Sequence, residues 1–109
     1  MIEVCHYITP AGKDVFDNWL SGLADPRAQA KIATRINRLA VGNFGDCKPL
    51  GRGLWELRID WGPGYRVYYA TLGRERVLLL CGGDKRKQPS DIDRASQYLK
   101  DFKERTGSQ

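Results

Sequence analysis

Apolar and polar residues alternate over residues 55–60, with the two-residue period of a strand that buries one face. The alternation resumes over residues 65–71, and the Gly62-Pro63-Gly64 segment between the two runs is typical of a turn. The pattern therefore predicts a β-hairpin in the middle of the sequence.

The register expected for this hairpin is the one that keeps its apolar side chains together on one face. It makes four cross-strand pairs: Ile59 with Val67, Leu57 with Tyr69, Arg58 with Tyr68, and Asp60 with Arg66. The other face is then polar and faces solvent, and it carries Glu56, Arg58, Asp60, Arg66 and Tyr68.

A third run, from Val77 to Cys81, is apolar at every position. Such a run is typical of a strand that is buried on both sides, so we expect it to be central in a sheet or covered by helices. It leads into residues 82–88, GGDKRKQ, which we expect to form a flexible basic loop beside the polar face of the hairpin.

Two helices are predicted before the hairpin by apolar residues at helical spacing. The first begins at Thr9-Pro10 and the second at Asp25-Pro26, because each pair joins a good N-cap to a proline that fits the first helical position. Gly42-Asn43 ends the second helix. The link between the two helices is very short, so we expect an antiparallel helical hairpin.

A first strand is predicted at residues 2–8, and a last helix begins at Ser90, which has the spacing of a capping box with Asp93. Residues 43–52 are predicted to be a loop. The order is thus strand, two helices, three strands and helix, in one domain of residues 1–109. This order predicts an α+β fold with helices packed on a sheet.

Composition limits the classes of function. Hydrophobic residues make up 41% and charged residues 28% of the chain, which is ordinary for a soluble globular protein. The formal net charge is +5. This charge permits a polyanionic partner, and it equally fits a protein that is merely basic.

Three widely spaced cysteines and one histidine, His6, do not form a metal-binding motif, so we expect no metal site and no cofactor. Neither a signal peptide nor an apolar run of membrane-spanning length is apparent. We therefore expect a cytoplasmic protein without a membrane partner.

The polar face and the basic loop suit phosphate chemistry. Metal-free cleavage of RNA requires a backbone held for attack by the 2′-hydroxyl, a neutralised transition state and the transfer of two protons. Arginine suits the second task because it stays charged and binds phosphate bidentately. A lysine crowded by other cations, or Glu56 or Asp60, suits proton transfer, and Tyr68 suits stacking on a base.

Other interpretations fit the same residues. The polar face is also what a surface network of salt bridges without catalysis would look like. The cations of the second helix fit a solvated face, contacts with phosphate or contacts with an acidic partner, and they are Arg27, Lys31, Arg35 and Arg38.

Two segments carry a family resemblance: GLWELRIDWGPGYRVYY at residues 53–69 and LLLCGGDKRKQPSDIDRA at residues 78–95. With them, over nearly its full length, the chain resembles the RelE/ParE superfamily of toxins from type II toxin–antitoxin systems. More specifically, it resembles the HigB-like, phage-associated branch called addiction module killer proteins.

The resemblance implies that the helical hairpin packs on a small twisted antiparallel sheet. It also implies a metal-independent, ribosome-dependent endoribonuclease that cuts mRNA and so inhibits translation and growth. By motif position the catalytic residues are Arg58, Arg66 and Lys85, while Glu56 departs from the pattern and is either a base or a partner of Arg58. We expect further RNA contacts from Lys48, Arg52, Tyr68, Arg86 and Lys87.

The resemblance further implies a cognate antitoxin, a small helix-turn-helix protein for which the basic second helix is a candidate contact. Two alternatives remain. One is a ParE-like inhibitor of DNA gyrase without nuclease activity. The other is a catalytically degenerate module that binds RNA without cutting it.

Overall fold

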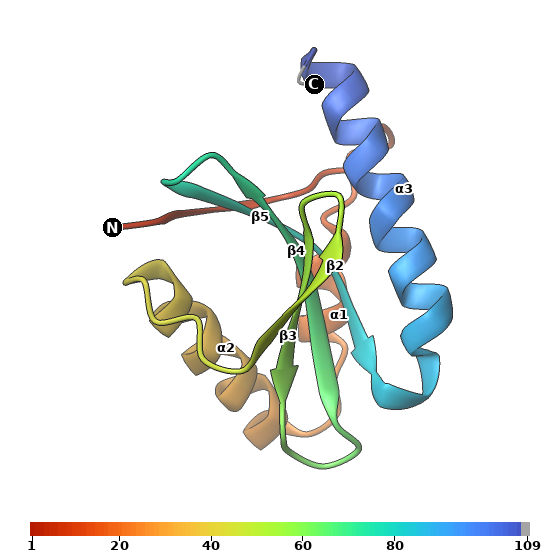
Figure 1. Ribbon diagram of the computed structural model, residues 1–109. Coiled ribbons are helices and arrows are strands. Elements are labelled where there is room, and N and C mark those ends of the chain that lie inside the picture. The colour runs from red at the N-terminus through yellow and green to blue at the C-terminus, as the bar shows by residue number, and fades with distance from the viewer. Residues whose placement is uncertain (108–109) are drawn as a thin grey trace.

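The computed structural model describes residues 1–107, which form one five-stranded sheet flanked by helices (Figure 1). The elements in order are β1 (Glu3–His6), α1 (Val15–Ser21), α2 (Pro26–Ala40), β2 (Cys47–Gly51), β3 (Leu54–Ile59), β4 (Tyr65–Leu72), β5 (Arg76–Asp84), the short 3-10 helix η1 (Lys85–Lys87) and α3 (Gln88–Thr106). The predicted α+β class is confirmed. None of the helices within the described residues is both long and apolar enough to cross a membrane.

The strand order is β1-β5-β4-β3-β2, and the sheet is mixed rather than purely antiparallel. β1 runs parallel to β5, while the other neighbours are antiparallel. β1 comes first in the chain and forms the sheet edge beside β5, whereas β2 to β5 follow as a meander of neighbouring strands. β5 is therefore an interior strand, and its predicted burial is confirmed, since Val77 to Cys81 are all buried.

Helices cover both faces of the sheet. α1 and α2 lie on one face, where Phe16, Ile32 and Leu39 pack with Leu57, Ile59, Val67, Tyr69, Val77 and Leu79. α3 lies on the other face, where Ala95 and Leu99 pack with Leu54, Tyr68, Ala70, Leu78 and Leu80. The hairpin face that we expected to face solvent is thus partly covered by α3 and contributes Tyr68 to a second hydrophobic core.

The predicted hairpin exists, but its predicted register is wrong by two residues. Leu57 lies opposite Val67, and Ile59 lies opposite Tyr65. The turn that connects β3 to β4 is shorter than expected, and the amide of Gly64 closes it by donating to the carbonyl of Trp61 at 3.0 Å. A shift of two residues leaves each side chain on its predicted face, so the alternation could not detect it.

Several segments differ from the predictions in their bounds or in their type. α1 begins at Val15 rather than at Thr9-Pro10, because the chain turns at Gly12 (φ +84) and Asp14 caps the helix. Residues 47–51, predicted as loop, form the edge strand β2. The basic segment is not a flexible loop, because β5 pairs with β4 as far as Asp84 and the 3-10 helix η1 follows directly.

The second helix agrees well with its signals. Asp25 caps α2, its carboxylate accepting from the amide of Arg27 at 2.9 Å, and Pro26 occupies the first turn. α3 begins at Gln88 rather than at Ser90, and no side chain caps it. The hydroxyl of Ser90 instead donates to the carbonyl of Lys87 at 3.1 Å, so the predicted capping box is absent.

Candidate functional site

The predicted polar residues occupy two neighbouring rows across the sheet on the α3 face. Cross-strand partners share a face of a sheet, so the pairings place Lys48, Glu56, Tyr68 and Cys81 in one row. The next row contains Arg58, Arg66 and Gly83. The start of α3 covers much of the first row, and Glu56 and Tyr68 keep only 1% and 0% of their surface exposed.

Glu56 is held by two partners beneath the first turn of α3. The amide nitrogen Nε2 of Gln88 donates to Oε1 of Glu56. The same oxygen lies 3.4 Å from Nε of Arg66, whose side chain is 14% exposed. Glu56 is therefore a partner of Arg66, not of Arg58 as the sequence suggested.

Arg58 lies directly opposite Arg66 on the neighbouring strand, so two cations stand side by side at one end of the sheet. Asp46 offsets the first of them, because Nε and Nη2 of Arg58 donate to Oδ1 of Asp46 at 3.1 and 2.8 Å. These hydrogen bonds raise the pKa of the Arg58 guanidinium above its ordinary value. Arg58 keeps 39% of its side chain exposed, which leaves room for an added anion.

Lys85 joins the arginines from η1. Its amide donates to the carbonyl of Gly64 at 2.8 Å, and this bond ties η1 to the β3–β4 turn. A Cβ at Gly64 would lie 3.6 Å from Cβ of Lys85 and 4.0 Å from Nη1 of Arg66. Lys85 and Arg66 thus flank the same glycine, and the Lys85 side chain is exposed.

The neighbouring Arg86 is engaged differently. Its Nη2 lies 3.1 Å from Oδ2 of Asp84, and 81% of its side chain is exposed. The hydrogen bond from Arg86 lowers the pKa of the Asp84 carboxyl below its ordinary value. Lys87 is also exposed. Both cations point out of η1 and remain available to a polyanion.

Two of the predicted RNA contacts are misplaced. Tyr68 has no exposed surface, so it cannot stack on a base. Its burial, together with the nearby Glu56 and Asp91, raises the pKa of its phenol above the ordinary value. Arg52 lies in the β2–β3 turn, about 20 Å along β3 from Arg58 at ~3.3 Å per residue.

Lys48 lies opposite Glu56 and is exposed. Asp60, which the sequence suggested as a base, lies beyond the last residue pair of β3 and β4.

Sequence reasoning missed Asp91, which is 3% exposed and lies on α3 above Gly83. Its Oδ1 accepts from Nη2 of Arg94 at 2.9 Å, whereas its buried Oδ2 has no hydrogen-bond partner. A Cβ at Gly83 would collide with Oδ2 of Asp91. One signal was available: Asp91 is spaced like Ala95 and Leu99 along the buried stripe of α3, and Gly83 interrupts a strand.

The row of cations on α2 is not one uniform surface. Arg35 is half-buried, and its guanidinium donates to the carbonyls of Arg58 and Phe44 at 2.6 and 3.2 Å. Lys31 lies over the ring of Trp61, with Nζ 4.5 Å from the ring centroid. Arg35 therefore holds the end of β3 in place and is not free to bind a partner.

The arrangement suits an anion best. Three cations from β3, β4 and η1 lie at one end of the sheet, and the middle one, Arg66, forms an ion pair with a buried carboxylate. Within residues 1–107 no three histidine, cysteine, aspartate or glutamate side chains are grouped so that they could hold a metal ion.

The family model named Phage derived protein Gp49-like (DUF891) matches residues 18–100. The chain belongs to this family. The matched Gp49-like region runs from α1 into α3, and it contains the site residues from Lys48 to Asp91.

The Gp49-like chain is also similar to a protein of Haemophilus influenzae, strain Rd, which is described as an uncharacterized protein. The two are 56% identical over 80 residues, covering 73% of this chain and 81% of the relative. The description of this relative adds no activity to the family assignment.

Proposed function

We propose that this Gp49-like protein is the toxin of a type II toxin–antitoxin pair and that it cleaves mRNA on the ribosome without a metal ion. One observation carries the proposal: Arg58 and Arg66 lie opposite each other on β3 and β4, and Lys85 lies beside Arg66 at Gly64, so three cations occupy one end of the sheet. Cations grouped in this way suit a phosphodiester whose transition state gains negative charge. Membership in a phage-derived family and the RelE/ParE-like motifs support the toxin assignment.

The proposed chemistry is an internal transfer within the RNA. The 2′-oxygen forms a bond to phosphorus as the bond to the 5′-oxygen breaks, giving a 2′,3′-cyclic phosphate and a 5′-hydroxyl. One proton leaves the 2′-hydroxyl and one is added to the 5′-oxygen. Arg58 and Arg66 neutralise the phosphate, because guanidinium groups bind its oxygens bidentately.

Glu56 has a positioning role in this proposal. Its carboxylate is buried, its Oε1 lies 3.4 Å from Nε of Arg66 as an ion pair, and Gln88 donates to the same oxygen. A group so enclosed cannot reach a 2′-hydroxyl unless Gln88 moves aside. Lys85 is exposed and lies beside Arg66, so it is better placed to meet the reacting oxygens.

The experiment is induction of the protein in growing cells, followed by sequencing of mRNA ends and measurement of plasmid supercoiling. The proposal expects growth arrest, new mRNA ends and unchanged supercoiling. Altered supercoiling without mRNA cleavage would instead support a gyrase inhibitor. Binding of RNA with neither effect would indicate a degenerate module.

A further inference from the structure

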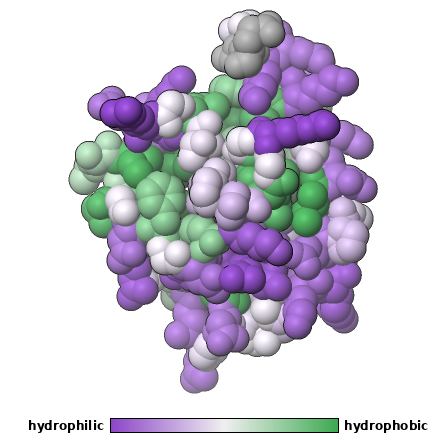
Figure 2. Space-filling model, viewed as in Figure 1, coloured by the Kyte–Doolittle hydropathy of each residue, from purple (hydrophilic) through white to green (hydrophobic). Residues whose placement is uncertain are grey.

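A groove of about 880 Å³ lies between the β2–β3 turn and α3. Its apolar surface comes from Leu50, Leu54, Ile92 and Leu99. Figure 2 shows apolar surface between the β2–β3 turn and α3, bordered by hydrophilic residues. The groove is separate from the cationic site, which lies at the opposite end of β3.

The groove has a preformed wall. Gly51, Arg52 and Gly53 all have positive φ angles, of 95°, 57° and 82°, so the turn curls through three consecutive left-handed residues. Among the described residues Arg52 is the one non-glycine with positive φ. Positive φ angles at Arg52 and Gly53 are those that a two-residue loop between Gly51 and Leu54 requires, so the turn beside the groove has a defined shape.

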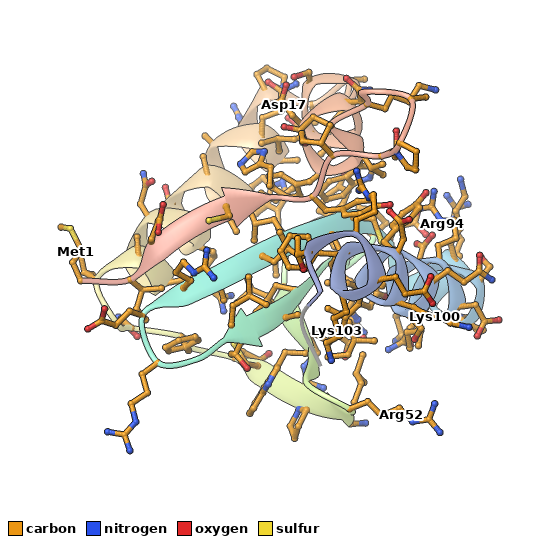
Figure 3. All side chains as sticks on the ribbon, turned by 90° about the horizontal axis from the view of Figure 1, so that it is seen from above. Met1, Asp17, Arg52, Arg94, Lys100 and Lys103 are labelled. Carbon is orange, nitrogen blue, oxygen red and sulfur yellow. The ribbon has the colours of Figure 1, made fainter. Side chains whose placement is uncertain are left out.

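Positive charge borders the groove. Its lining contains three cations, Arg52, Lys100 and Lys103, against one carboxylate, Glu104. Figure 3 shows Arg52 on the hairpin turn and both lysines on α3, all on one side of the molecule. Within residues 1–107, none of these three cations forms an ion pair, so their charge is available to a partner.

We propose that this groove binds an acidic amphipathic helix of a partner protein. The aliphatic floor would take the apolar side of that helix, and the cations would meet its carboxylates. The lining contains no aromatic side chain, whereas surfaces that bind single-stranded nucleic acid usually stack bases on aromatic rings. The part of α3 that lines the groove runs from Ile92 to Glu104 and is roughly 18 Å long, which gives room for about three turns of a partner helix.

This inference goes beyond the proposed function, because it does not require that the protein cleave RNA. It also differs from the sequence-based expectation that a partner contacts α2. Of the four cations on α2, Arg35 and Lys31 are occupied by carbonyl oxygens and by Trp61, which leaves the exposed Arg27 and Arg38, whereas all three cations of the groove lack an ion pair within the described part of the chain.

The test uses NMR titration of the labelled full chain with a synthetic helical peptide that carries leucines on one side and glutamates on the other. We expect saturable shifts confined to the amides of residues 50–54 and 92–107. Replacing the peptide's glutamates by glutamine, or its leucines by serine, is expected to weaken binding by roughly tenfold or more. The first change removes the charges that the cations of the groove would meet, and the second removes the apolar side that would pack on its aliphatic residues.

The variant Lys100→Glu with Lys103→Glu tests the protein side and is expected to weaken binding of the acidic peptide by roughly tenfold. A matched control, Lys13→Glu with Arg74→Glu, makes the same charge change at exposed sites outside the groove and is expected to bind normally. The proposal fails if the peptide causes no shifts, if the shifts map to α2, or if a short RNA causes the same shifts more strongly than the peptide.

Discussion

Nε of Arg66 lies 3.4 Å from a carboxylate oxygen of Glu56, and the start of α3 shields both side chains from solvent. Glu56 is 1% exposed, so its carboxylate belongs to the buried interior of the protein as well as to the cationic site. The ion pair keeps a negative charge next to the Arg66 guanidinium, which lies near Arg58 and Lys85. It therefore links the stability of the fold to the geometry of the cationic site.

Replacing Glu56 tests this link through stability. Glu56→Ala leaves the Arg66 guanidinium without its partner in a poorly solvated place, so we expect the free energy of unfolding to fall by about 3 kcal/mol. Urea denaturation of the wild type and the variant measures this difference in the free energy of unfolding. The exposed Glu104, which forms no ion pair within the described residues, provides a control: Glu104→Ala is expected to change stability by less than ~0.5 kcal/mol. Equal effects of the two substitutions would argue against a structural role for the Glu56 contact.

Gly83 is expected to be intolerant of any side chain. In Gly83→Ala the added Cβ collides with Oδ2 of Asp91, and we expect a loss of about 2 kcal/mol in the free energy of unfolding. Part of that loss should disappear in the Asp91→Ala background, where the colliding atoms are absent. A double-mutant cycle by chemical denaturation measures the coupling, and strict additivity would contradict the contact.

The alternation of apolar and polar residues was enough to predict the hairpin, as the continuous apolar run was for the buried strand β5 and the helical spacing for α2. It could not distinguish registers two residues apart, since both place Leu57 and Val67 on the same face. The tight connection after Ile59 decides between them, and its hydrogen bonds are not visible in a hydrophobic pattern.

The site was harder to predict because its environment comes from a distant element. The apolar stripe of α3 was correctly predicted, but the face that it covers was not. Once α3 lies on the hairpin, Tyr68 becomes a core residue and Glu56 is enclosed by Gln88. The sequence predicted that Arg58, Arg66 and Lys85 lie near one another, but not that Arg58 is directly opposite Arg66 or that the amide of Lys85 bonds to Gly64.

Tyr7 is expected to give the protein an alkaline limit of stability. Its hydroxyl donates to Oδ2 of Asp101 at 2.6 Å, and burial and this bond raise the pKa of Tyr7 to about 12. The pKa of this phenol is higher in the folded protein than in the unfolded chain, where it is about 10. The protonated phenol therefore stabilises the fold fully below about pH 10, and this stabilisation is lost as the pH rises through about 12.

The variant Tyr7→Phe isolates this effect. We expect it to be less stable than the wild type by about 1.5 kcal/mol at pH 8, since the hydrogen bond is made to a charged group. The difference should narrow as the pH is raised to about 11, which urea denaturation at each pH would show. A difference that stays constant over this range would contradict the assigned hydrogen bond.

Trp55 is expected to matter less than a fully buried aromatic residue. Its ring stacks on Tyr69, with centroids 6.4 Å apart, but it remains partly exposed. We expect Trp55→Ala to cost about 1.5 kcal/mol, and Phe16→Ala, at a residue only 3% exposed, to cost about 3 kcal/mol or more. Thermal and chemical denaturation of both variants provide the comparison, and a larger loss for Trp55→Ala would contradict the assigned packing.

The central claim is that the cations around Gly64 act on an RNA phosphate. Its most direct test is to sequence 5′-hydroxyl mRNA ends after induction of the wild type, of Arg66→Ala and of Arg74→Ala, which removes an exposed cation from the β4–β5 turn. We predict new 5′-hydroxyl ends in phase with codons for the wild type and for Arg74→Ala, and their loss in a folded Arg66→Ala protein. New ends at undiminished frequency with Arg66→Ala, or growth arrest by the wild type without any new ends, would contradict it.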